Sequence, residues 1–183
     1  MRNGSGFLYS QPNPHLCTKE SRHGWQTRVE VAEPRFEHGP FLLIAGFGGR
    51  FTQDSTEDIP ALWEKLIPHL GKIPAQVGEV TYGVCCNADG EGGFEYIAGV
   101  QIDKLDDLPE KYRWVEIQPQ HYAVFEHKGP LEQLPETFQY IWNTWLPQSG
   151  REAADAPEFE RYSADFNPKQ QTGTLEIWLP LKP

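Results

Sequence analysis

Apolar and polar residues alternate in several short segments, which is the pattern of half-buried β-strands. The predicted strands are residues 27–36, ended by Pro34, then 41–51, 80–86, 94–102, 112–117, 121–127, 159–166 and 174–181. Two longer segments carry apolar residues at helical spacing and predict helices at about residues 55–69 and 130–147. Gly71 and Gly150 follow them, where the C-terminal cap of a helix is expected.

The order strand, helix, strand, strand occurs twice, over residues 41–102 and 121–181. A shift of 80 residues superposes three identical pairs, namely Tyr82 on Tyr162, Asn87 on Asn167 and Gly93 on Gly173. This internal repeat predicts a duplicated βαββ unit. We therefore expect an α+β fold in which two units form antiparallel sheets, with helices on one side and a central ligand cleft on the other.

The last predicted strand indicates which residues face that cleft. Its odd-numbered residues, from Leu175 to Leu181, are all leucine or isoleucine and are expected to pack beneath the helices. Applying the same alternation to the equivalent positions of the repeat predicts which residues face the cleft. These are Tyr82, Tyr96, Glu160, Tyr162 and Trp178. A carboxylate buried among rings is costly unless a partner compensates it, so Glu160 is the centre of the predicted site.

The composition limits the class of ligand. The chain has 16 Lys and Arg against 26 Asp and Glu, a net charge of −10. A negative surface repels phosphate backbones and favours cations, so we expect no direct binding to DNA or RNA. Neither a membrane-spanning stretch nor a secretory signal is evident, which predicts a cytoplasmic protein. No residue spacing typical of a metal or cofactor site is found, and we expect neither.

Residues 1–26 carry Gly, Pro, Asn and Ser without periodicity and are expected to form a tail or an ordered arm. Residues 27–183 are then expected to form one domain, a length sufficient for a hydrophobic core.

Six segments in this order resemble the gyrase-inhibitor-like, AraC-type effector-binding domain, which occurs in multidrug-responsive transcription regulators and as a stand-alone protein. They are residues 59–63 (IPALW), 82–85 (YGVC), 94–100 (FEYIAGV), 122–125 (YAVF), 157–162 (PEFERY) and 176–180 (EIWLP). The resemblance spans about residues 27–182. It implies two βαββ halves and a small, cationic or amphipathic ligand held between aromatic rings against a buried acid, which corresponds to Glu160 here.

The resemblance leaves three functions open. The first is a stand-alone module that binds an effector or drug, since the residues before position 27 are too few for a helix-turn-helix. The second is a hydrolase of electrophilic, cyclopropane-containing molecules, with Glu160 activating water and Tyr162 or Tyr82 positioning the substrate. The third is a protein-interaction module of the gyrase-inhibitor type. Two further alternatives concern single residues: Glu160 as a structural acid held by Arg161, a tyrosine hydroxyl or backbone amides, and ligand contacts from Trp63 or Trp142.

Overall fold

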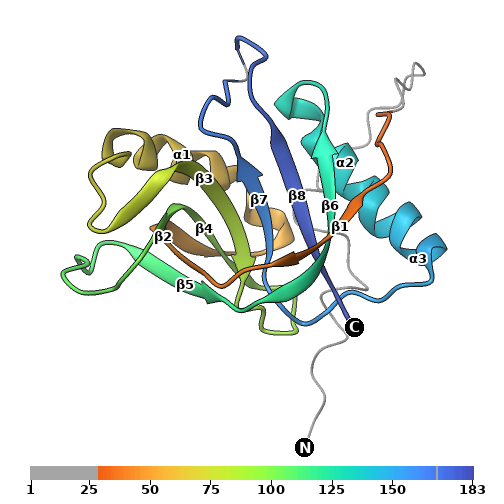
Figure 1. Ribbon diagram of the computed structural model, residues 1–183, viewed down its shortest axis with the longest axis horizontal. Helices are drawn as coiled ribbons and strands as arrows, with labels where there is room; N and C mark the ends of the chain where they lie inside the picture. The colour runs from red at the N-terminus through yellow and green to blue at the C-terminus, as the bar shows by residue number, and fades with distance from the viewer. Residues whose placement is uncertain (1–28, 168) are drawn as a thin grey trace, which may run out of the picture.

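The computed structural model describes residues 29–167 and 169–183. Eight antiparallel strands form a single curved sheet in the order β1-β6-β8-β7-β3-β4-β2-β5 (Figure 1). The strands are β1 (Arg35–Gly39), β2 (Leu42–Phe51), β3 (Gln76–Cys86), β4 (Phe94–Ile102), β5 (Arg113–Ile117), β6 (Gln120–His127), β7 (Glu158–Tyr162) and β8 (Leu175–Leu181). The main helices are α1 (Ile59–Leu66), α2 (Leu134–Tyr140) and α3 (Leu146–Ser149).

The predicted duplication is confirmed by the order of the strands. One half runs β2-α1-β3-β4 and the other β6-α2-β7-β8. They join edge to edge through β3 and β7, which pair antiparallel, with Gly83 opposite Glu160. Strand β5 extends the first half beside β2, and β1 extends the second beside β6. The α+β class and the two βαββ units are therefore as the sequence predicts.

Both faces of the sheet are packed. Figure 1 shows α1 with the first half and α2 and α3 with the second. Leu66 of α1 belongs to one apolar cluster with Tyr96, Ala98 and Val100 of β4, and Phe138 of α2 belongs to another with the odd-numbered residues of β8. We call the face that carries these two clusters the helix face. The opposite face has its own apolar cluster, built from all strands except β1; its aromatic members are Tyr82, Tyr122, Phe159 and Trp178.

Several boundaries differ from the predicted ones: β3 begins at Gln76 instead of residue 80, and β7 ends at Tyr162 instead of residue 166. Strand β1 begins after Pro34 rather than ending there, because proline lacks the N–H that a ladder uses; Thr27 and Arg28 lie outside the described residues. The second helical segment is also not a uniform helix. Residues Ile141–Trp145 form a π-helical turn between α2 and α3, and Gly150 (φ 70°) ends the segment in the left-handed conformation.

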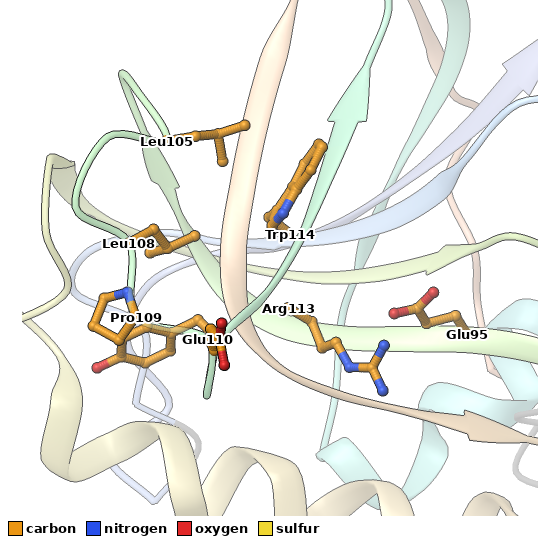
Figure 2. Close-up of a pocket in the computed structure, with 8 residues that line it drawn as sticks. Glu95, Leu105, Leu108, Pro109, Glu110, Arg113 and Trp114 are labelled. Carbon is orange, nitrogen blue, oxygen red and sulfur yellow. The ribbon is translucent and has the colours of Figure 1, made fainter.

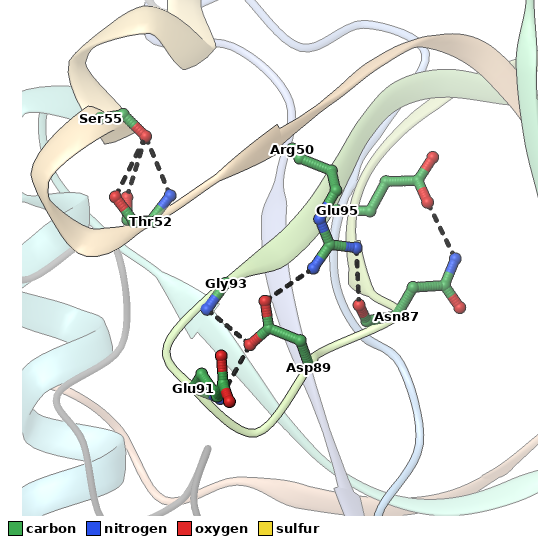
Figure 3. A network of polar contacts seen from close by, with 8 residues as sticks. All are labelled: Arg50, Thr52, Ser55, Asn87, Asp89, Glu91, Gly93 and Glu95. Atoms are coloured by element: carbon green, nitrogen blue, oxygen red, sulfur yellow. Dashed lines mark hydrogen bonds and ion pairs between the residues drawn. The ribbon is translucent and has the colours of Figure 1, made fainter.

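The β3–β4 hairpin is closed by a surface network (Figure 3). Asp89 accepts hydrogen bonds from the backbone N–H groups of Glu91 and Gly93, and these bonds hold the pKa of Asp89 below its usual range. Arg50 of β2 donates to the same carboxylate and to the carbonyl of Asn87. The network fixes the loop structurally.

No helix in the described part of the chain has the length and apolar character needed to cross a bilayer.

Candidate functional site

Glu160 of β7 is the centre of the site, and it is only 2% exposed. Its Oε2 atom accepts two hydrogen bonds, one from the hydroxyl of Tyr162 at 2.7 Å and one from the hydroxyl of Tyr96 at 3.1 Å. Tyr162 lies two residues further along the same strand and therefore shares the face of Glu160. Two donors on one oxygen compensate the burial of a carboxylate, which is acceptor-only when ionised.

Tyr96 reaches Glu160 because β3, the strand between them, has a glycine at the crossing point. Tyr96 pairs with Cys85 on β3, and the next residue of β3 on this face is Gly83, which pairs with Glu160. A Cβ added at Gly83 would lie 2.1 Å from the Tyr96 hydroxyl and 2.7 Å from Glu160 Oε2. The missing side chain of Gly83 thus opens the path from β4 to β7.

Helix α1 extends this network through Trp63. The indole Nε1–H of Trp63 donates to the Tyr96 hydroxyl at 3.1 Å, which leaves the tyrosine proton for Glu160. The Trp63 ring also packs edge-on against Tyr162, with 4.9 Å between ring centroids. Trp63 is only half-buried, so it covers the acid from the solvent side.

A second buried acid, Glu158, lies two residues before Glu160 on the same face. Its Oε2 atom accepts a hydrogen bond from Nε1–H of Trp142 at 3.0 Å. Trp142 is half-buried and belongs to the π-helical turn, a local widening of the helix that often occurs at functional sites. Helix α1 and the π-helical turn thus each direct one indole N–H into this region, that of Trp142 to Glu158 and that of Trp63 to the Tyr96 hydroxyl. We call Trp63, Tyr96, Trp142, Glu158, Glu160 and Tyr162 the acid site.

Burial and the nearby acids raise the pKa of three neighbouring groups. Burial raises the pKa of Tyr96 and Tyr162 well above 10, and the charge of Glu160 raises both further. Burial also raises the pKa of the Cys85 thiol, reinforced by Glu158 and Glu160. The two phenols and the thiol consequently stay neutral at physiological pH. They line the site as hydrogen-bonding groups without charge.

The predicted grouping of five residues on one face, away from the helices, is wrong. Glu160, Tyr162 and Tyr96 lie on the helix face, whereas Tyr82 and Trp178 belong to the opposite face. The pairing of β3 with β7 gives the reason: Tyr162 is opposite Thr81, and Tyr82 is opposite Arg161. Tyr82 and Tyr162 therefore point in opposite directions, and the 80-residue shift does not preserve the side of the sheet.

Trp178 and Tyr82 are placed in a second aromatic cluster. Trp178 stacks on Phe159 with 5.3 Å between centroids, and Tyr82 meets Phe159 edge-on at 5.9 Å. The acid on this face is Glu176, which forms ion pairs with Arg35 and Arg161. Arg161 thus extends away from Glu160, and of the structural partners expected for Glu160 a tyrosine hydroxyl is found.

Three members of the site were not among the predicted site residues. Glu158 has the same parity as Glu160, so the strand pattern alone was sufficient to include it. Trp63 and Trp142 were expected in the core, with ligand contact as the alternative, and the sequence gives no sign that their indoles point toward acids. The role of Gly83 follows only from the register of three strands.

Two open hollows in the described part of the chain lie away from Glu160. One of about 550 Å³ lies at the β5 edge, where Figure 2 shows Leu105, Leu108 and Pro109 beside Arg113 and Trp114. The other, of about 490 Å³, lies beside β1 and the end of β8 and includes His38 and His121. In the first, Glu95 and Glu110 are not buried, and the second contains no buried acid. We favour the acid site because its carboxylates are desolvated among rings, a setting that strengthens charge recognition.

Three relatives illustrate the comparison with known proteins. The transcriptional regulator BrlR of Pseudomonas aeruginosa is 32% identical over 156 residues, which are 84% of this chain and 57% of BrlR. The chain thus spans little more than half of that regulator. The structure of SAV2435 bound to tetraphenylphosphonium has a TM-score of 0.66 at 21% identity, covering 82% of this chain and 94% of that one. An integron cassette protein of Vibrio cholerae has a TM-score of 0.62 at 21% identity, covering 84% and 99%.

The likeness to both solved structures establishes the fold. The match to a known family covers residues 32–182, which include every strand and helix described above. By that match, and by its identity with BrlR over most of its own length, the chain belongs to the family of GyrI-like small molecule binding domains.

Proposed function

We propose that the chain binds a small, cationic, amphipathic organic molecule at the acid site, with the positive charge beside Glu160 and the apolar groups between Trp63 and Trp142. The observation that supports this most directly is a carboxylate, 2% exposed, that is held by two tyrosine hydroxyls beneath two half-buried indoles. Aromatic faces attract organic cations by about 0.5–2 kcal/mol each, more when the contact is desolvated.

Two further findings support a cationic ligand. The net charge of −10 favours the approach of cations. A structural neighbour, SAV2435, is described with tetraphenylphosphonium bound, a cation with four aromatic rings. In the present structure Trp63 and Trp142 cover the acids, so a ligand would enter by displacing these two side chains.

Titration with tetraphenylphosphonium tests the proposal on three proteins: wild type, Glu160→Gln and Glu176→Gln. Each variant removes the charge of one buried glutamate, on opposite faces of the sheet. We expect Glu160→Gln to weaken binding at least about tenfold and Glu176→Gln to change it less than about twofold. Equal affinity of Glu160→Gln and wild type, or an equal loss in both variants, would contradict the proposal.

The hydrolase alternative uses the same acid and stays a prediction. Tyr82 is removed from it, because it lies across the sheet from Glu160. Tyr162 remains, and its hydroxyl donates to Glu160. Turnover of a cyclopropane-containing electrophile that is lost in Glu160→Ala would favour hydrolysis over binding alone.

A further inference from the structure

We infer that His38 and His121 form a two-histidine site for a transition-metal ion, separate from the acid site. In the sheet, β6 and β8 lie between β1, which carries His38, and β7. The inference follows from three features: the two residues are directly opposite each other, their rings have the separation that a shared ion requires, and their ring nitrogens make no hydrogen bond to any described residue. It does not depend on the proposed function.

The pairing of β1 with β6 brings the two histidines together. His38 is directly opposite His121 in this antiparallel ladder. Residues in such positions share a face and have Cβ atoms about 4.5–5.5 Å apart. Both side chains are exposed, so an ion can reach them from solvent. The two residues are far apart in the chain, which is why no metal-ligand spacing is evident in the sequence.

The separation of the two rings fits two ligands on one ion. The ring centroids of His38 and His121 are 4.7 Å apart, and the ring planes are inclined by 58°. Imidazole nitrogens bind zinc at about 2.0–2.1 Å; with the ring centre about 1.1 Å further away and an angle of about 90–110° at the ion, two ligand rings have centroids about 4.5–5.2 Å apart. The observed separation lies within this range, so one ion can bind both rings without movement of the strands.

The other histidines in the described part of the chain use their ring nitrogens within the fold. His127 engages both of its nitrogens in hydrogen bonds, and His69 engages Nδ1. The rings of His38 and His121 contact each other but form no such bond with a described residue. Neutral imidazole is the commonest metal ligand in proteins, and here a nitrogen of each ring is available to bind an ion.

The ligand type indicates which ions the site takes. Imidazole suits Zn²⁺, Cu²⁺ and Ni²⁺, whereas Mg²⁺ and Ca²⁺ prefer oxygen ligands. No group of three or more His, Cys, Asp or Glu among the described residues is placed to hold one ion. The histidine pair therefore supplies two ligands, and water or an added molecule in the adjoining hollow of about 490 Å³ completes the coordination.

The charges around the hollow oppose a bound cation only weakly. Arg151 and Lys182 border it and are both exposed, so their charges are screened by salt. Lys182 is also paired with Glu152. The net charge of −10 favours the approach of a metal ion to the chain as a whole.

Calorimetric titration with Ni²⁺ tests the inference on the full chain, in a buffer that does not bind metal ions. Ni²⁺ is the probe because it favours imidazole. The proteins are wild type, His38→Gln, His121→Gln and the variant with both changes. The matched control is His15→Gln with His23→Gln, which removes two histidines outside the described residues. Titration with Mg²⁺ measures the attraction of the acidic chain for any divalent cation.

We expect wild type to bind one Ni²⁺ at least about tenfold more tightly than His38→Gln or His121→Gln does, and at least about tenfold more tightly than it binds Mg²⁺. The control variant should stay within about twofold of wild type. Because both rings hold one ion, the variant with both changes should be at most about twofold weaker than either single variant.

Three results would overturn the inference. The first is equal Ni²⁺ affinity of wild type and both single variants. The second is a loss in the control as large as the loss in His38→Gln. The third is two equal sites in wild type, of which each single variant loses one while the other keeps its affinity, because independent histidines do not form a chelate. Tetraphenylphosphonium affinity should be unchanged in His38→Gln and His121→Gln, so this test and that of the proposed function fail separately.

Discussion

The two faces of the sheet each bury a glutamate among aromatic rings, and they hold it differently. On the helix face, the hydroxyls of Tyr96 and Tyr162 donate to Glu160. On the opposite face, Arg35 and Arg161 form ion pairs with Glu176. Guanidinium partners neutralise an acid and make it part of the fold, whereas the tyrosine hydroxyls hold the carboxylate of Glu160 by hydrogen bonds. This difference is why we assign ligand binding to the helix face.

The largest effect is expected when a side chain is added at Gly83, the residue of β3 that lies between Tyr96 and Glu160. In Gly83→Ala the new Cβ would collide with the Tyr96 hydroxyl and with Glu160. We expect a loss of about 2–3 kcal/mol in the free energy of unfolding, together with at least about tenfold weaker tetraphenylphosphonium binding. Urea unfolding and ligand titration measure the two effects.

Gly39→Ala is the matched control on the opposite face, because its Cβ would meet the Tyr122 ring at 2.6 Å. It should also destabilise the protein, by about 1–3 kcal/mol, but leave cation affinity within about twofold of wild type. If Gly39→Ala weakened binding as much as Gly83→Ala, the effect would report general destabilisation and the distinction between the faces would be lost.

A smaller effect should distinguish the half-buried Trp63 from the buried Trp178. Trp63→Phe removes the donor to Tyr96 and is expected to cost about 1–2 kcal/mol and to weaken cation binding. Trp178→Phe removes an indole N–H that is buried without a hydrogen bond to any described residue, so it should cost less and leave binding unchanged. Denaturant unfolding of both variants, with ligand titration, checks the order. A greater loss of binding in Trp178→Phe would reverse the assignment of faces.

The last predicted effect is on stability and is confined to alkaline pH. The pKa values of Tyr96 and Tyr162 are raised above 10 in the folded protein, so the unfolded chain loses these protons first. Their contribution to stability is fully present below about pH 10 and decreases above it, by about 1.4 kcal/mol per pH unit for each group.

Unfolding of wild type and Tyr162→Phe from about pH 9 to about pH 11 measures this slope, which should be shallower in the variant. Tyr122→Phe provides the comparison on the opposite face, where burial alone raises the pKa to about 12. Its slope should also be shallower, without a change in cation affinity at neutral pH. Identical slopes in wild type and Tyr162→Phe would show that the Tyr162 hydroxyl is not held as described.

The sequence was sufficient for the fold but only partly for the site. The repeat, the hairpin at residues 87–93 and the burial of Glu160 follow from local patterns, and the structure contains all three. The grouping of Tyr82 with Tyr162 failed because a shift of one residue in strand register exchanges the two faces. That register depends on the pairing of β3 with β7, which lie far apart in the chain. Indole positions and the open path at Gly83 depend on the same long-range pairing.

A crystal structure of the chain with tetraphenylphosphonium tests the central claim most directly, because it locates the cation. We predict that the phosphonium lies on the helix face beside Glu160, with its phenyl rings against Trp63 and Trp142 and within about 6 Å of their ring centroids. A cation bound instead against Trp178 and Tyr82 on the opposite face, or in the hollow at the β5 edge, would contradict the account.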